Sequence, residues 1–113
     1  MASNASIPNY EELASFISYT FSTLRAPYME WANLARRAIQ GLSYNEYRFA
    51  ELEDFINLRR DELRLAVLLA SEHFEEATLV ELRSSARMSK TAWKSLRKKG
   101  PITMKNGFSL LSY

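Results

Sequence analysis

The chain has 113 residues, 47% of them hydrophobic, which suits one domain with a core that needs no covalent staples. It contains no cysteine, which excludes a disulfide framework and a thiolate metal site. Residues 1–77 hold seven arginines and twelve acidic residues, a net charge of −5, whereas residues 78–113 hold eight basic residues and one acidic residue, a net of +7. This asymmetry suggests an acidic partner for the C-terminal part, although a solvated basic tail, or one that pairs with the acidic first half, would give the same counts.

The compartment is predicted from what the sequence lacks. Its N-terminus has no basic segment followed by an apolar run, so we expect no signal peptide. The longest apolar stretch, residues 65–70, is too short to span a bilayer, and no membrane partner is expected. We therefore expect a soluble intracellular protein: cytoplasmic and nucleoid-associated, or nuclear if its source is eukaryotic or viral.

The N-terminal half shows helical periodicity throughout. Residues 1–8 are expected to form a disordered tail, and residues 9–58 an N-terminal helical segment, rich in aromatic side chains, for packing and dimerisation. Asn9 followed by Glu12 is a helix start signal, and the apolar spacing continues to about residue 25.

Three further helices are predicted before residue 74. Pro27 suits the first turn of a second helix, and Gly41 is a natural stop for it. Residues 43–46, Ser-Tyr-Asn-Glu, form a capping box for a third helix that reaches about residue 58. A fourth covers about 59–73, although the boundary at 57–58 is weak and the two helices could be one.

The predicted fourth helix is apolar on two faces. One face carries Leu63, Ala66, Val67 and Ala70, and the other carries Leu65, Leu68 and Leu69. A helix with two apolar faces is buried on two sides. One side would serve the C-terminal module, and the other would pack on the N-terminal helices or on a second subunit.

The C-terminal third alternates helix signals with turn signals. Residues 78–81, Thr-Leu-Val-Glu, form a capping box for a short helix over 79–86, and Ser89 is an N-cap for a helix over 90–99, ended by Gly100. An Asn-Gly pair at 106–107 separates two short apolar runs at 102–104 and 108–111, which predicts a β-hairpin.

This order of helix, short helix, tight turn, helix and hairpin resembles the winged helix-turn-helix superfamily over residues 59–113. The residues that carry the resemblance have the spacing with which such domains lock two helices across a turn: Leu82, Ala86, Met88, Trp93 and Leu96. The expected fold is therefore mainly α, with N-terminal helices followed by a winged helix-turn-helix whose wing is a short C-terminal hairpin.

The resemblance implies duplex DNA binding by the basic second helix, whose outer side chains would enter the major groove. The expected contacts are Ser89, Lys90, Thr91, Lys94, Ser95, Arg97 and Lys98 on that helix, Arg83 and Arg87 beside it, and Lys105 at the wing tip. The simplest role is a small dimeric transcriptional regulator or a replication or partition accessory protein. An RNA-binding small viral protein and a winged-helix adaptor for other proteins are the alternatives, and cations at a helix C-terminus also complement the helix dipole without any ligand.

Catalysis is not expected. The sequence has no Ser-His-Asp set, no phosphate-binding glycine loop and no convincing carboxylate pair, so we predict no catalytic residue and no cofactor. His73, the single histidine, lies beside Glu72, Glu75 and Glu76, but a metal site needs more good ligands than these, and no metal is expected.

Overall fold

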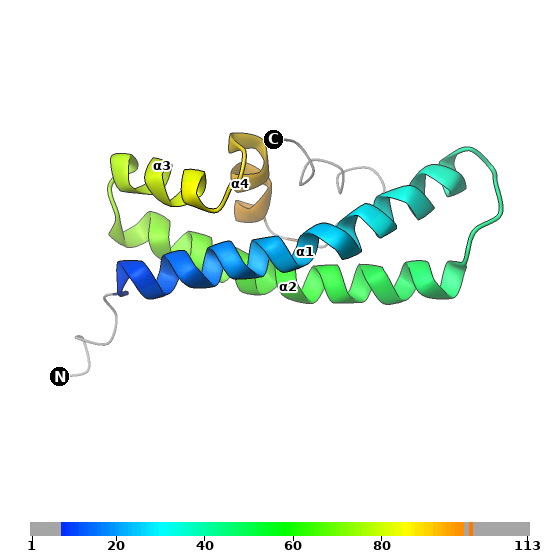
Figure 1. Cartoon of the computed structure of the whole chain (residues 1–113), viewed down its shortest axis with the longest axis horizontal. Helices are drawn as coiled ribbons and strands as arrows, with labels where there is room; N and C mark the ends of the chain where they lie inside the picture. Colours follow the sequence, from blue (N-terminus) through cyan, green and yellow to red (C-terminus); the bar gives the residue numbers. More distant parts are fainter. Residues whose placement is uncertain (1–7, 99, 101–113) are drawn as a thin grey trace.

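The computed structural model describes residues 8–98 and 100, and four α-helices make up this part of the chain (Figure 1). They are α1 (Tyr10–Ile39), α2 (Glu46–His73), α3 (Glu76–Ser85) and α4 (Lys90–Arg97). α1 and α2 pair as a long antiparallel hairpin, and α3 and α4 lie together on one side of it (Figure 1). The prediction of a mainly α-helical protein is confirmed.

The predicted winged helix-turn-helix is wrong. No strand occurs in residues 8–98 and 100, and the first helix of the expected module is the second half of a 28-residue helix that pairs with α1. The hairpin expected at 102–111, with Lys105 at its tip, lies outside the described residues. The residues that carried the resemblance are buried, but they belong to two short helices, joined by a tight turn, that pack on the α1–α2 pair.

The start of α1 is as predicted, but its end is not. The Asn9 side chain caps the helix by accepting a hydrogen bond from the Glu12 backbone N–H at 3.0 Å. The predicted break before Pro27 is wrong, because α1 continues through this residue, which lies near the middle of its 30 residues. A proline inside a helix removes one hydrogen bond and bends the axis, and α1 bends near its middle (Figure 1). The flanking Leu24 and Tyr28 are each only 2% exposed, so burial on both sides holds the bent helix in place.

The turn between α1 and α2 uses glycine at the one position that requires it. Gly41 has a φ of 75°, and the Leu42 N–H donates to the Arg37 carbonyl at 2.9 Å, which together form a Schellman ending. Gly41 is therefore the stop that the sequence predicts. The predicted capping box at residue 43 is wrong, because Asn45 is the N-cap of α2 and accepts from the Arg48 N–H at 2.9 Å.

α2 is one helix, so the boundary expected near residue 58 falls inside it. No glycine or proline interrupts it, and one row of side chains is buried along its whole length. That row is Phe49, Leu52, Ile56, Arg60, Leu63, Val67 and Ala70. Arg60 is charged and yet only 4% exposed.

Aromatic side chains join α1 to α2. Trp31 is fully buried, stacks on Phe49 with ring centroids 5.7 Å apart, and meets Tyr28 edge-on at 5.6 Å. At the other end of the hairpin, Tyr10 meets Phe74 edge-on at 5.6 Å. Aromatic pairs in these geometries add to the stabilisation that burial provides. They therefore stabilise the packing of α1 on α2 at two separate positions along the helices.

α3 and α4 meet across a tight turn. The capping box expected at residue 78 is wrong, because α3 starts at Glu76 without a side-chain cap. α3 ends with the same hydrogen-bond pattern as α1: the Met88 N–H donates to the Arg83 carbonyl at 3.0 Å. Here Arg87, with a φ of 57°, stands where α1 has glycine. Ser89 is the N-cap of α4, as predicted, and α4 ends at Arg97 rather than 99.

Candidate nucleic-acid interface

The outer side of α4 is basic. Trp93 and Leu96 point inward, at 8% and 0% exposure, as the sequence predicts. Lys90, Lys94 and Arg97 follow steps of four and three residues, which align side chains along one side of a helix, and all three are exposed. At 1.5 Å per residue this row is about 10 Å long.

Two more exposed cations adjoin this row, one at each end of α4. Arg87 precedes the helix and Lys98 follows it, and Thr91 is an exposed polar residue between them. We use the term basic face for Arg87, Lys90, Thr91, Lys94, Arg97 and Lys98. The structure therefore brings most of the predicted contact residues together on one surface.

The cations of the basic face have no acidic partner in the described part of the chain. The salt bridges found there lie on the hairpin, as with Arg48 and Glu30 at 2.8 Å, or join His73 to Glu72 at the end of α2. α4 has no acidic residue in its first turn, so Lys90 lies at the positive end of the helix dipole. The lysine and the helix dipole therefore both carry positive charge at this end of α4, and both attract anions.

Arg87, within the basic face, and Arg83, beside it, differ in burial and in hydrogen bonding. Arg87 is exposed in a left-handed backbone conformation that a non-glycine residue adopts at a disadvantage of about 1–2 kcal/mol. Strained residues of this kind concentrate at functional positions. The Arg83 side chain is half-buried and reaches back toward the Met88 carbonyl at 3.5 Å, so it is partly engaged in the turn.

Three predicted contact residues have other surroundings. The Ser89 hydroxyl accepts the Ala92 N–H at 3.0 Å as the cap of α4, and the residue is half-buried. Ser95 is also half-buried, and its carbonyl accepts a hydrogen bond from α2. Lys105 lies outside the described residues.

Arg60 fixes the C-terminal end of α4, a role that was not predicted from the sequence. Its Nη2 donates to the carbonyls of Ser95 at 2.7 Å and Lys98 at 3.0 Å, and its Nη1 donates to the carbonyl of Gly100. A cation at this position satisfies carbonyls that a helix end leaves unpaired and complements the negative end of the dipole. Burial lowers the pKa of Arg60, and the nearby Asp61 carboxylate opposes that shift.

A signal for Arg60 exists in the sequence. Residues 56, 60, 63 and 67 continue one row at helical spacing, so an unbroken helix through 57–58 places the guanidinium on the buried face. A buried charge requires hydrogen-bond partners, and the carbonyls at the end of α4 are those partners.

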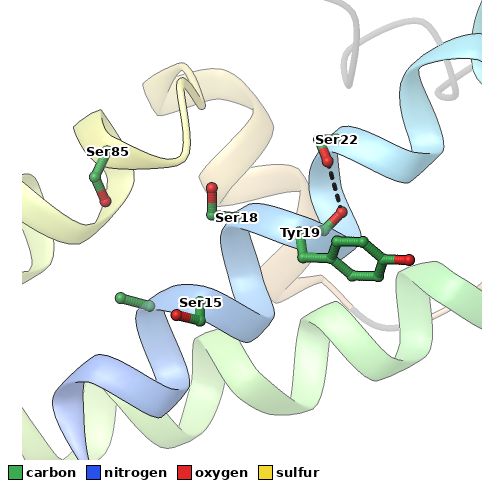
Figure 2. Close-up of a pocket in the computed structure, with 6 residues that line it drawn as sticks. Ser15, Ser18, Tyr19, Ser22 and Ser85 are labelled. Carbon is green, nitrogen blue, oxygen red and sulfur yellow. Dashed lines mark hydrogen bonds between the residues drawn. The ribbon is translucent and has the colours of Figure 1, made fainter.

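An open groove of about 420 Å³ lies between α1 and α3 (Figure 2). Its lining is Ala14, Ser15, Ser18, Tyr19, Ser22 and Ser85. The Ser22 hydroxyl donates to the Tyr19 carbonyl at 2.7 Å, and the Ser85 hydroxyl to the Leu82 carbonyl at 3.1 Å (the first is dashed in Figure 2). The groove holds no charged side chain, and two of its hydroxyls are used within their own helices, so it does not define a ligand site.

The part of the chain that the structure describes contains no group of three or more His, Cys, Asp or Glu residues arranged to hold a metal ion. None of its helices has both the length and the apolar character needed to cross a membrane.

Comparison of the chain with models of protein families, with curated proteins and with solved structures gave no match.

Proposed function

We propose that the protein binds duplex DNA through the basic face. The observation that carries the proposal is the exposed row of Lys90, Lys94 and Arg97, which has no carboxylate partner among the described residues. Phosphate oxygens would supply the missing acceptors, and release of condensed counterions from DNA would supply much of the binding free energy.

The dimensions of α4 fit this role. An α-helix with its side chains is about 10–12 Å across, and the major groove of B-DNA is about 12 Å wide, so α4 can lie in it. With the N-terminal end of α4 in the groove, Lys90 and Thr91 are placed for base edges. Lys94 and Arg97 then lie closer to the phosphates, where contacts set register and affinity rather than sequence preference.

The surroundings of α4 support a rigid presentation. The inward Trp93 and Leu96 belong to the core, and Arg60 holds the last carbonyls of the helix. A rigid helix loses little conformational entropy on binding. The simplest biological role is a small transcriptional regulator or a replication or partition accessory protein.

The test is a titration of a labelled random-sequence DNA duplex, followed by fluorescence anisotropy over a range of salt concentrations. We expect K94Q/R97Q to weaken binding by roughly tenfold per lost phosphate contact and to reduce the salt slope by about 2. The matched control is R36Q/R37Q, which removes two exposed arginines at the end of α1 far from α4 (Figure 1). This control should bind like the wild type.

Three results would contradict the proposal. Equal losses in the two double variants would mean that net charge, not the basic face, drives binding. A salt-independent affinity would exclude phosphate contacts. Preference for duplex RNA over duplex DNA in the same titration would replace the proposal with an RNA-binding role, in which helix shape and backbone dominate recognition.

A further inference from the structure

α2 exposes an apolar row on the side turned away from its buried row. We use the term α2 stripe for Phe55, Leu58, Leu65 and Leu69. Leu58 and Leu65 are 60% and 65% exposed, and Phe55 and Leu69 are each 38% exposed. With Glu62 in the gap, the steps alternate between three and four residues, which keeps the row on one face of the helix. Of the second apolar face expected from the sequence, Leu65 and Leu69 belong to this row and are exposed among the described residues, whereas Leu68 is half-buried.

The other described helices lie elsewhere. α1 packs on the buried row of α2, and α3 and α4 lie together on one side of the hairpin (Figure 1). The stripe extends from residue 55 to residue 69, about 21 Å along the axis. Single exposed apolar side chains are ordinary, whereas an apolar row at alternating steps of three and four, here interrupted once by Glu62, is typical of the seam between paired helices.

We propose that the α2 stripe is the interface with a second copy of this chain, in which the two α2 helices pack antiparallel, stripe against stripe. The proposal does not depend on the proposed function. The sequence predicts a dimer through the N-terminal helical segment. The present proposal narrows the interface to one face of α2.

The charges along the stripe favour a second copy in this orientation. Arg48 and Glu51 extend the two rows of the stripe before Phe55, and Glu72 extends them after Leu69. A parallel pair in register would place each charged residue of the row beside its own copy, giving four unfavourable contacts between like charges, at Arg48, Glu51, Glu62 and Glu72. An antiparallel pair with Phe55 beside Leu65 of the second copy instead places Arg48 beside Glu72 of the second copy, at both ends of the interface.

Charged side chains along the stripe already have conformations in the single chain that suit this antiparallel arrangement. Arg48 uses three N–H groups on Glu30 and Glu51, and a guanidinium has five. Arg59 lies over the Phe55 ring at 5.6 Å and holds Glu62 at 2.8 Å. Because Glu62 is paired within its own helix, its carboxylate can lie at the edge of the interface while its methylene groups contact Leu58 of the second copy.

The first test is sedimentation of the full chain, without nucleic acid, from about 1 to 200 μM, since a single helix pair is expected to associate in the micromolar range. L58E/L65E should be monomeric throughout and should keep the circular dichroism of the wild type. The matched control is I39E/V80E, which adds the same charge at residues 64% and 41% exposed, outside α2. This control should dimerise like the wild type.

The second test measures orientation. The chain has no cysteine, so E46C places a single nitroxide label at the first residue of α2. Pairing of residue 55 with 65 puts the two labels about 40 Å apart in the antiparallel dimer, whereas a parallel dimer puts them about 10–15 Å apart, close to one interhelical spacing. Pulsed electron paramagnetic resonance distinguishes these distances.

The outcomes are decisive. A wild-type protein that remains monomeric at the highest concentration overturns the proposal, as does a control variant that dissociates as readily as L58E/L65E. A short label distance overturns the antiparallel arrangement. DNA titrations do not enter either measurement, so failure of DNA binding and failure of this interface are separate results.

Discussion

The α1–α2 hairpin and the α3–α4 pair are held together by different means. The hairpin consists of helices of 30 and 28 residues, joined over their length by buried aliphatic and aromatic side chains. α3 and α4 have ten and eight residues, lengths at which an isolated helix is barely stable in water. They depend on a few inward residues, chiefly Leu82, Met88, Trp93 and Leu96, and on the guanidinium of Arg60.

The difference indicates that the α1–α2 hairpin holds the basic face in its conformation. The cations of α4 repel one another, and the helix is too short to persist alone, so its geometry is supplied by the hairpin beneath it. Perturbing the hairpin should therefore remove both regions, whereas perturbing α4 should remove only one. Three sets of variants test this expectation, in decreasing order of their effect on stability.

The two tryptophans give the largest contrast. W31A and W93A should each destabilise the protein by about 3–5 kcal/mol, the range for a large aromatic lost from a core, measured by urea denaturation. Hydrogen exchange should then differ between them. W31A should lower protection throughout, whereas W93A should lower it in residues 76–98 and leave the hairpin protected. Y47A, at a residue 82% exposed, is the control and should change stability by no more than about 0.5 kcal/mol. Equal loss of protection in both variants would mean that the two regions unfold as one unit.

Arg60 gives the next effect. R60M keeps the volume of the side chain but removes its hydrogen bonds to three carbonyls, and should destabilise the protein by about 2–3 kcal/mol. Its neighbour Arg59 is the matched control, because it forms only a half-exposed ion pair with Glu62. R59M should lose at most about 1 kcal/mol. If the two variants have the same urea midpoint, the contacts to the end of α4 contribute nothing to stability.

The smallest changes in stability are expected at the two residues with a positive φ that follow α1 and α3, Gly41 and Arg87. The two changes have opposite signs. R87G should stabilise the protein by about 1 kcal/mol, because glycine adopts a positive φ without strain. G41A should destabilise it by a similar amount, although a Cβ there meets no atom within 4 Å, since only the backbone conformation opposes it. Thermal melts of both variants check the pair. A destabilised R87G would show that the Arg87 side chain has structural contacts that outweigh its backbone strain.

Local signals in the sequence predicted local features. Asn9 and Ser89 were identified as N-caps and Gly41 as a stop, because each acts through neighbours within a few residues. The inward positions of Trp93 and Leu96 followed from helical spacing. Most of the basic face was predicted for the same reason, since the exposed side of α4 is the complement of its buried side.

Features that depend on tertiary packing were missed. Pro27 disfavours a continuous helix locally, but the burial of Leu24 and Tyr28 on α2 outweighs that preference. The winged-helix interpretation treated residues 59–73 as the start of a module, whereas packing against α1 makes them the continuation of α2. The role of Arg60 does not follow from its sequence neighbours, because its acceptors lie on a different helix.

The contact between Arg60 and α4 has a consequence for the order of events in folding. Its acceptors lie 35, 38 and 40 residues further along the chain, whereas each side-chain cap spans only three residues. Contacts between distant residues close long loops and tend to form late, because the chain loses conformational entropy before the contact contributes its free energy. We therefore expect the end of α4 to dock after the rate-limiting step, so that R60M accelerates unfolding and leaves the rate of refolding nearly unchanged in stopped-flow measurements.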